Sequence, residues 1–221
     1  MSCRPRIALI HAVEVAMAPI RAAMAEGWPE AEVVNLLDDS LAPDRAAEAE
    51  LSEAMTARIV GLARYAAGLG AEAVLFTCSA FGPAIERAAA ELAIPVLKPN
   101  QAMFGAALAA GVHIGMLATF APAVGGMEAE FAAEARRHAS PADLTTIVVP
   151  EAMAALRRGD GETHDRLLAE RAGALAHCDA VLLAHFSTSR AAAAVRGALR
   201  VPVLTSPEAA VAQLRRRLGA A

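Results

Sequence analysis

The residues best suited to chemistry stand where short apolar runs of the sequence end. Cys78 follows the run Ala73–Phe76 in the stretch LFTCSAFGPAIE, and a helix-forming segment begins at Gly82. Helix N-termini carry unpaired N–H groups and partial positive charge, which stabilise a thiolate or bind a carboxylate. The sequence therefore predicts Cys78 as a reactive thiol, with donors from Ser79 and the backbone at Ala80. The alternative is a buried cysteine that packs as a small apolar residue.

His185 holds the corresponding place in a second stretch, LLAHFSTSRAAA. An imidazole can take up or release a proton near neutral pH. Ser187 follows with a further hydroxyl, and Phe120 and Phe186 each follow the end of a predicted strand. We expect these aromatic rings to line a pocket for an apolar or aryl group, with core packing as the alternative. For His185 the alternative is a core histidine satisfied by the backbone.

Apolar runs of strand length alternate with alanine-rich helical segments along the whole chain. Runs that lack period-two alternation and lie between helices are typical of strands covered on both faces. The pattern predicts an α/β fold with mostly parallel sheets. The expected strands are Ile7–Ile10, Val33–Leu36, Ala73–Phe76, Val96–Leu97, His113–Ala118, Leu144–Val148, Ala180–Ala184 and Val201–Leu204, and the expected helices lie near 15–26, 46–69, 82–93, 101–110, 121–138, 163–176, 189–199 and 207–218.

Four landmarks recur at one ungapped offset of 107 residues, which indicates an internal repeat. They are Ile7–Ile10 with Ile114–Leu117, Pro43 with Pro150, Ala73–Leu75 with Ala180–Leu182, and Pro95–Leu97 with Pro202–Leu204. The repeat predicts two similar α/β lobes, 1–105 and 106–221, related by a pseudo-twofold axis, with the segment 207–221 able to pack back on the first lobe. Chance matching in an alanine- and valine-rich chain is the alternative.

Ligands of parallel sheets bind outside the carboxyl ends of the strands. We therefore expect Cys78 and His185 to face one cleft between the lobes. His11, at the end of the first predicted strand, is expected to contact the substrate there or to be a packed or surface histidine. Glu14 follows it and is expected either to orient a base or to be solvated. His164 lies in the first turn of a predicted helix and is expected to be exposed.

Composition argues against several classes of protein. The formal net charge of −4 and an aromatic content of 4% offer no basic surface or stacking platform for nucleic acid. No apolar run reaches the roughly 18–20 residues of a membrane span, and Glu14 interrupts the N-terminal apolar run, so we expect a cytoplasmic protein. Three scattered cysteines, Cys3, Cys78 and Cys178, predict thiols rather than a disulfide framework. Phosphate-binding glycine motifs and metal-ligand spacings are absent, so we expect no cofactor and no metal.

The chain resembles the aspartate/glutamate/hydantoin racemase superfamily, which includes arylmalonate decarboxylases and maleate isomerases. The resemblance rests on Thr77-Cys78-Ser79, which is similar to the first cysteine motif, and on Met116-Leu117-Ala118-Thr119, which is similar to the threonine-bearing turn of the second lobe. It covers nearly the whole chain. It implies an active site in the cleft between two pseudo-symmetric lobes, substrate carboxylate binding by Thr119, and a dimer or higher homo-oligomer.

His185 departs from this pattern, because racemases of the superfamily have a second cysteine there. The resemblance still implies a cofactor-independent racemase or epimerase of a small carboxylate, with Cys78 taking the α-proton and His185 delivering one to the opposite face. A decarboxylase or a cis–trans isomerase of the same fold is the second interpretation. A Cys/His hydrolase and a non-catalytic binding protein remain further alternatives.

Overall fold

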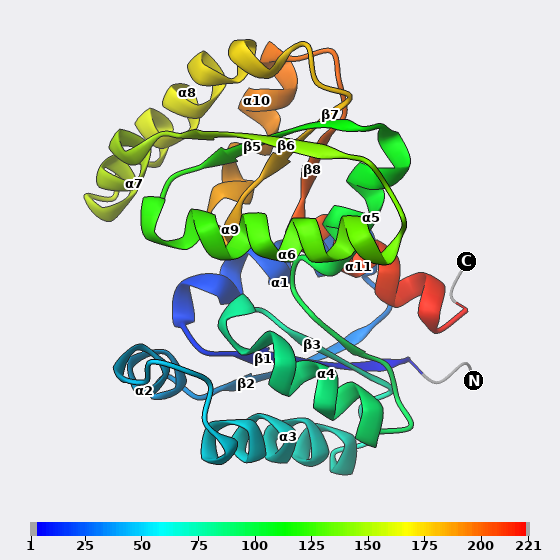
Figure 1. Cartoon of the computed structure of the whole chain (residues 1–221). Helices are drawn as coiled ribbons and strands as arrows, with labels where there is room; N and C mark the ends of the chain where they lie inside the picture. The colour runs from blue at the N-terminus through cyan, green and yellow to red at the C-terminus, as the bar shows by residue number, and fades with distance from the viewer. Residues whose placement is uncertain (1–3, 220–221) are drawn as a thin grey trace. The chain divides into compact units, whose positions relative to one another are not determined.

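The computed structural model describes residues 4–219 of the 221-residue chain, so Cys3 lies outside the described part. The chain divides into two compact units, coloured along the chain in Figure 1. The described residues of unit 1 are 4–100 and 210–219, and those of unit 2 are 101–209. Each unit has its own four-stranded sheet and its own buried core.

The sheet of unit 1 has the strand order β2-β1-β3-β4, and all its pairs are parallel. Its strands are β1 (Arg6–His11), β2 (Glu32–Leu37), β3 (Ala73–Phe76) and β4 (Val96–Leu97). The central strand β3 is buried at all four positions. Its continuous apolar sequence therefore reflects cover on both faces of the sheet.

The helices of unit 1 cover both faces of this sheet. They are α1 (Met17–Gly27), α2 (Leu41–Ala47), α3 (Glu53–Gly68), α4 (Gly82–Glu91) and the later part of α11 (Ser206–Arg217). Met55 and Ile59 of α3 and Ile85 of α4 pack together against the sheet residues Val74 and Phe76. Figure 1 shows α1 on the opposite face of the sheet from α3 and α4.

Unit 2 repeats the arrangement with the strand order β6-β5-β7-β8, again all parallel. Its strands are β5 (His113–Ala118), β6 (Asp143–Val148), β7 (Ala180–Leu183) and β8 (Val203–Thr205), and its helices are α5 (Gln101–Ala110), α6 (Val124–Arg137), α7 (Pro150–Arg157), α8 (Gly161–Ala172), α9 (His185–Thr188), α10 (Ala192–Ala198) and the start of α11. Alternate residues of β5 enter different cores. Met116 packs with α5 and α6, whereas Leu117 packs with α8 and α10.

The register of the strands carries the sequence repeat into the structure. Ile7 of β1 lies opposite Ala73 of β3, and Ile114 of β5 lies opposite Ala180 of β7. Both partners of the first pair recur 107 residues later in the second pair. The predicted α/β fold with parallel sheets is confirmed, and all eight predicted strands are present to within two residues at either end.

Two helical predictions were wrong. The segment 46–69 is not one helix, because α2 ends at Ala47, Glu48 has an extended backbone (ψ 135°) and α3 begins only at Glu53. Helix α7 was missed, although Pro150 stands in its first turn, where proline is favoured. His164 in α8 is fully buried rather than exposed.

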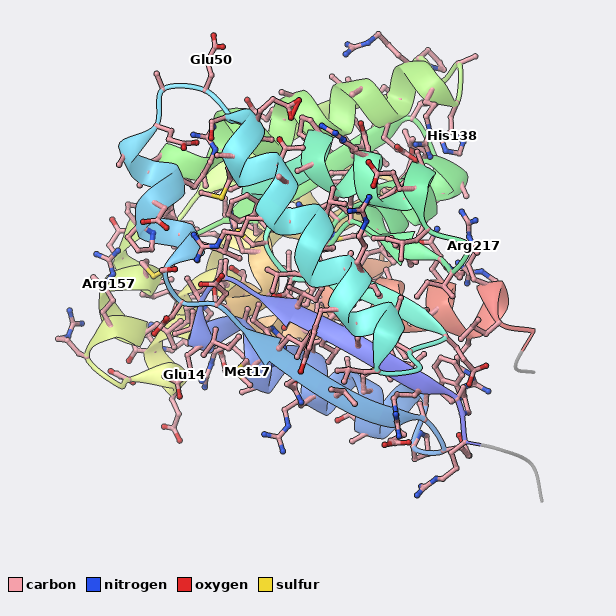
Figure 2. The ribbon with its side chains drawn as sticks, turned by 90° about the horizontal axis from the view of Figure 1, so that it is seen from below. Glu14, Met17, Glu50, His138, Arg157 and Arg217 are labelled. Atoms are coloured by element: carbon pink, nitrogen blue, oxygen red, sulfur yellow. The ribbon has the colours of Figure 1, made fainter. Side chains whose placement is uncertain are left out.

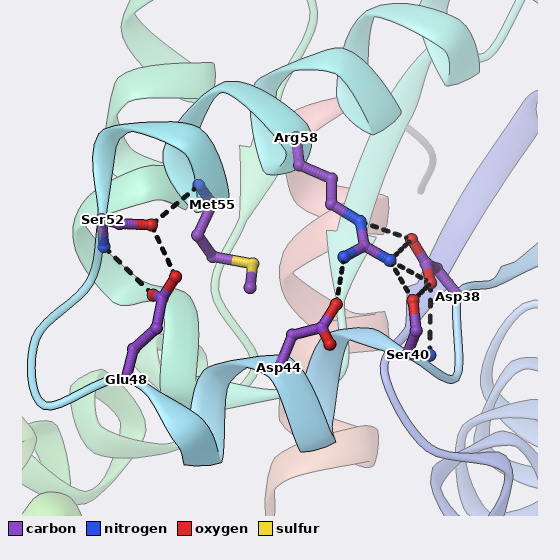
Figure 3. Close-up of polar contacts among 7 residues, drawn as sticks. All are labelled: Asp38, Ser40, Asp44, Glu48, Ser52, Met55 and Arg58. Atoms are coloured by element: carbon purple, nitrogen blue, oxygen red, sulfur yellow. Dashed lines mark hydrogen bonds and ion pairs between the residues drawn. The ribbon is translucent and has the colours of Figure 1, made fainter.

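The loop after β2 is fixed by Arg58 of α3, as Figure 3 shows. The guanidinium donates to Asp38 with distances of 2.6 and 2.9 Å, to Asp44 at 2.6 Å and also to Ser40. Burial acts to raise the pKa of Asp38, but the hydrogen bonds from Arg58 and Ser40 outweigh it and lower that pKa. The network holds the chain at the carboxyl end of β2, beside the end of β1, because the Asp38 N–H donates to the His11 carbonyl.

Candidate active site

Cys78 lies one residue beyond the end of β3, at the carboxyl edge of the unit 1 sheet. It is the N-cap of a 3-10 turn, Ser79–Phe81, that runs directly into α4 at Gly82. Cys78 and Ser79 are half-buried and Ala80 is exposed. The predicted strand–thiol–helix arrangement is therefore present, and it aims the first N–H groups of a helical segment past the strand end.

His11 lies deeper in this edge than the sequence suggested. Its side chain is fully buried, its Nδ1 is 2.9 Å from the Thr77 hydroxyl, and its Nε2 is 3.1 Å from Asn35 Oδ1. With hydrogen on Nε2, the ring donates to Asn35. Nδ1 then shares the single Thr77 hydroxyl proton with the Ile10 carbonyl, which lies 3.3 Å from that hydroxyl. Burial lowers the pKa of His11, and the hydrogen bond to Asn35 only partly opposes it. Both ring nitrogens are thus used inside the protein, in a bridge between β2 and the residue that precedes Cys78.

Glu14 takes no part in this bridge. It is exposed in the 3-10 turn Glu14–Ala16, and Figure 2 shows its side chain pointing away from the protein. The sequence predicted either that Glu14 orients a base or that it is solvated. Its exposed position agrees with solvation.

His185 lies at the matching edge of unit 2, directly after Ala184, which follows β7. Its backbone φ is +67°, in the left-handed region that favours glycine. A histidine in this region costs on the order of 1–3 kcal/mol and persists only where the surrounding structure enforces it. The turn is sharp because α9 starts at His185 itself. Residues with strained backbone conformations occur most often at functional sites. At His185 the left-handed conformation ends the extended chain and turns it directly into α9.

The His185 imidazole is half-buried, and its surroundings shift its pKa. Its Nδ1 is buried without a hydrogen-bond partner in the described structure. Burial lowers the pKa of His185, and a backbone hydrogen bond to Ala184 only partly opposes this. The neutral imidazole, which can accept a proton, is therefore the main form at neutral pH.

Two more polar atoms without partners lie at this edge of unit 2. Thr119 follows β5, the strand next to β7, and is 2% exposed, while Thr188 in α9 is fully buried. Neither hydroxyl has a hydrogen-bond partner among the described residues. Buried polar groups are nearly always paired in folded proteins. The hydroxyls of Thr119 and Thr188 use none of their hydrogen-bonding capacity within the described residues, so they can donate to a molecule bound at this edge. Thr188 was not predicted as a site residue, although it stood among the hydroxyl residues after His185.

The other predicted residues of unit 2 divide by exposure. Ser187 is half-buried, and Phe120 is 40% exposed at the start of the loop after β5. Phe186 is 4% exposed, so its ring belongs mostly to the packed interior. The structure therefore groups His11, Cys78, Ser79 and Ala80 at the unit 1 edge, and Thr119, Phe120, His185 and Ser187 at the unit 2 edge.

Sequence reasoning missed Asn35, although a polar residue in the predicted buried strand Val33–Leu36 was a usable signal. The left-handed backbone of His185 had no usable signal, because histidine adopts this region in only a small fraction of cases, although more often than most residues. In the part of the chain that the structure describes, no cluster of three or more metal-ligating side chains occurs. Within residues 4–219, none of the helices is long and apolar enough to cross a membrane.

Comparison with known proteins places the fold. The chain matches the Asp/Glu/Hydantoin racemase family over residues 13–177. A search of curated proteins gave no match. Similar solved structures include allantoin racemase from Klebsiella pneumoniae (TM-score 0.75, 21% identity, 97% of this chain and 88% of that one) and aspartate racemase from Picrophilus torridus (0.70, 15%, 97% and 94%).

A third similar structure is a glycine-to-cysteine variant of arylmalonate decarboxylase in a sulfate-associated form (TM-score 0.71, 22% identity, 97% of this chain and 94% of that one). At these identities the three structures share a fold with this chain. The family match spans most of the sequence, and the topology agrees with it. The chain belongs to the Asp/Glu/Hydantoin racemase family.

Proposed function

We propose that this protein is a cofactor-independent racemase or epimerase that moves an α-proton of a small carboxylate between His185 and Cys78. The observation that carries the proposal is the geometry of His185. It combines a left-handed backbone at a strand end with an unpartnered Nδ1 and a lowered pKa. This strained backbone places the His185 imidazole, a base in its neutral form, at the carboxyl end of β7. Ligands of parallel sheets bind at this end of the strands.

The repeat supports pairing His185 with Cys78. Cys78 follows β3 and His185 follows β7, and these two strands hold the same place in sheets of identical order. We propose that the two lobes are related by a pseudo-twofold axis, in which case these equivalent strand ends would face one cleft. A thiol and an imidazole there would approach one substrate carbon from opposite faces, which inversion requires.

In the first half of the proposed reaction, neutral His185 removes the α-proton. The C–H electron pair moves into the carboxylate, which becomes an enediolate. Hydroxyl donors at Thr119 and Ser187 and the N–H groups of Ser79 and Ala80 are suited to stabilise the added negative charge. Aimed donors in a partly dry site are often the largest single contribution to such catalysis.

In the second half, the Cys78 S–H gives its proton to the opposite face of the carbon. The product then has the inverted configuration, with imidazolium on His185 and thiolate on Cys78. Reaction from the other enantiomer runs backwards, with the Cys78 thiolate as base and the His185 imidazolium as acid. The electron count is unchanged throughout, so the scheme needs no redox partner.

We propose that His11 acts through its neighbours. It bonds the Thr77 hydroxyl at 2.9 Å and is fully buried, so its effect on the reaction would come from holding the chain that presents Cys78. The substrate contact that the sequence suggested for His11 stays a prediction.

Decarboxylation of a malonate-type acid is the second candidate function. Apolar side chains stand exposed where β1, β2, β5 and β6 end, namely Val13, Val15, Leu37, Phe120 and Val148. Such surroundings suit a substrate with an apolar substituent, and arylmalonate decarboxylase is among the proteins of similar fold. In this case loss of CO2 would form the enediolate, and one of the two residues would protonate it.

Incubation in D2O with single enantiomers of aspartate and glutamate, and with phenylmalonate, separates the two functions. Racemisation predicts deuterium at the α-carbon together with the opposite enantiomer and no CO2. Decarboxylation predicts CO2 release from phenylmalonate alone. If Cys78→Ala retains full activity on the substrate that reacts, the proposed role of the thiol is wrong.

A further inference from the structure

A hollow of about 280 Å³ lies in unit 1, well away in sequence from the catalytic turn. Its walls come from α1, from the segment that follows α1, and from the edge strand β2. The volume is close to the lower end of the roughly 300–1,000 Å³ typical of small-molecule sites. It suits one small metabolite rather than a dinucleotide or a peptide.

The polar groups in the hollow are donors. Arg21 contributes a guanidinium that makes no ion pair or hydrogen bond within residues 4–219, and Trp28 contributes an indole N–H. Asn35 Oδ1 already accepts from His11, so the part of Asn35 left for a ligand is its NH2 group. None of the described side chains that line the hollow is acidic. Three hydrogen-bond donors, with no acidic side chain in the described lining, favour a negatively charged ligand.

The remaining lining is apolar. Met24, Ala25 and Val33 stand among the wall residues, and the indole of Trp28 is 97% covered. Polar atoms make up the larger share of the accessible lining, and the hollow is open to solvent. A small organic anion can bond the polar atoms and also cover the apolar side chains, whereas an inorganic anion would leave those side chains against water. An arginine also binds a carboxylate in two-point fashion, which fixes the orientation of a planar ligand.

We propose that this hollow is a binding site for a small carboxylate with a flat apolar body, held by Arg21 beside Val33 and the accessible edge of Trp28. The site does not depend on the proposed function, because none of its residues belongs to the proposed reaction. It borders the polar bridge of unit 1 through Asn35, whose amide also accepts from His11. A ligand that bonds the Asn35 NH2 group polarises the same amide.

The test uses the full chain and two matched probes, benzoate and benzamide. Trp28 is the single tryptophan of the sequence, so its fluorescence reports this site directly. Benzoate is expected to change the emission along a saturable curve. Benzamide has the same shape without the charge, and it is expected to bind at least about 10-fold more weakly. An unchanged emission with benzoate, or equal binding of both probes, overturns the proposal.

Two pairs of variants locate the binding. Arg21→Gln should weaken benzoate binding about 10-fold or more, whereas Arg136→Gln, an exposed arginine of α6, should not. Ala25→Leu should fill the hollow and abolish binding, whereas Ala22→Leu, exposed on α1 outside the lining, should leave it unchanged. These four residues are exposed, so circular dichroism is expected to match the wild type. Loss of binding in both members of a pair, or in neither, contradicts the assignment.

Discussion

His185 is the residue at which the proposed catalytic pair departs from the two thiols that the family resemblance implies. A pair of thiols is chemically symmetric, whereas a thiol and an imidazole are not. Burial lowers the pKa of His185, so the imidazole of the proposed pair rests in its neutral form and can act as a base. Because two enantiomers have equal free energy, kcat/KM must still follow one pH profile in both directions, and we expect the lowered pKa of His185 to set the acidic side of that profile.

The first prediction concerns the pH profile. In the direction where His185 is the base, its protonation stops the reaction. Because its pKa lies below the ordinary 6.5, kcat/KM should fall to half of its plateau only below pH 6.5. The equilibrium constant of 1 makes this profile the same from either enantiomer. The measurement is kcat/KM from pH 4.5 to 8.5, starting from each enantiomer. A fall to half of the plateau above pH 7 would contradict the proposed role of His185.

The second prediction concerns stability and His11. Its pKa is lowered by burial, so the unfolded chain binds more protons than the folded one below pH 6.5. The free energy of unfolding should therefore fall as the pH falls from 6.5, and level off below the pKa of the folded state. Urea denaturation at pH 7.5 and 5.5 measures the difference.

The His11→Gln variant should show a smaller loss of stability between these two pH values than the wild type, whatever its stability at pH 7.5. His177→Gln, at an exposed position, is the control and should keep the wild-type pH dependence. An unchanged pH dependence in His11→Gln would mean that His11 is not held neutral by burial.

At the scale of elements, the sequence was most informative about strands and least informative about breaks between helices. The sequences of buried strands such as Ala73–Phe76 are unbroken runs of apolar residues, so their positions could be predicted to within a residue or two. The break between α2 and α3 depends on Ser52, whose hydroxyl accepts from the Met55 N–H at 3.2 Å (Figure 3). Alanine-rich segments on both sides favour helix equally and conceal the break.

The third prediction tests that break. Ser52→Ala should destabilise the protein by about 1 kcal/mol, because it removes the N-cap of α3, whereas Ser52→Gly should cost only a few tenths. The Ser52 hydroxyl also donates to Glu48 at 2.8 Å, which adds to the loss in both variants. Chemical denaturation of the two variants and the wild type gives the comparison. Equal stability of Ser52→Ala and the wild type would show that the cap does not set the start of α3.

The site shows the same division between what sequence can and cannot predict. Cys78 and His185 could be predicted because reactive side chains followed buried strands in both halves of the repeat. The burial of His11, the part played by Asn35 and the left-handed backbone of His185 could not. The first two depend on contacts between residues far apart in the sequence, and the third depends on backbone strain. Long-range contacts and backbone strain produce no recognisable local pattern in the sequence.

At the scale of the whole molecule, the chain forms most of unit 1, then unit 2, and then returns to unit 1. Residues from Ala210 onward belong to unit 1, where Val211 and Leu214 are buried and Arg215 donates to the Gly27 carbonyl at 2.8 Å. The C-terminal half of α11 is thus part of the core that supports α1. A simple division of the sequence at its midpoint therefore does not give two complete units.

The fourth prediction follows from this connection. A chain that ends at Ala209 loses the burial of Val211 and Leu214, which is worth about 3–6 kcal/mol in total. Unit 1 should be destabilised, and amide hydrogen exchange should quicken in α1 and β1. A control chain that ends at Leu218 should exchange as the full chain does. Unchanged protection of α1 in the shorter chain would contradict the assignment of this segment to unit 1.

The most direct measurement of the central claim is α-proton exchange in D2O by two single variants, each given each enantiomer of the substrate. If Cys78 and His185 serve opposite faces, each variant loses inversion but retains one base. Cys78→Ala should then exchange the α-proton of one enantiomer with retention of configuration, and His185→Gln should do so only for the other. Exchange of the same enantiomer by both variants, or inversion by either one, would contradict the account.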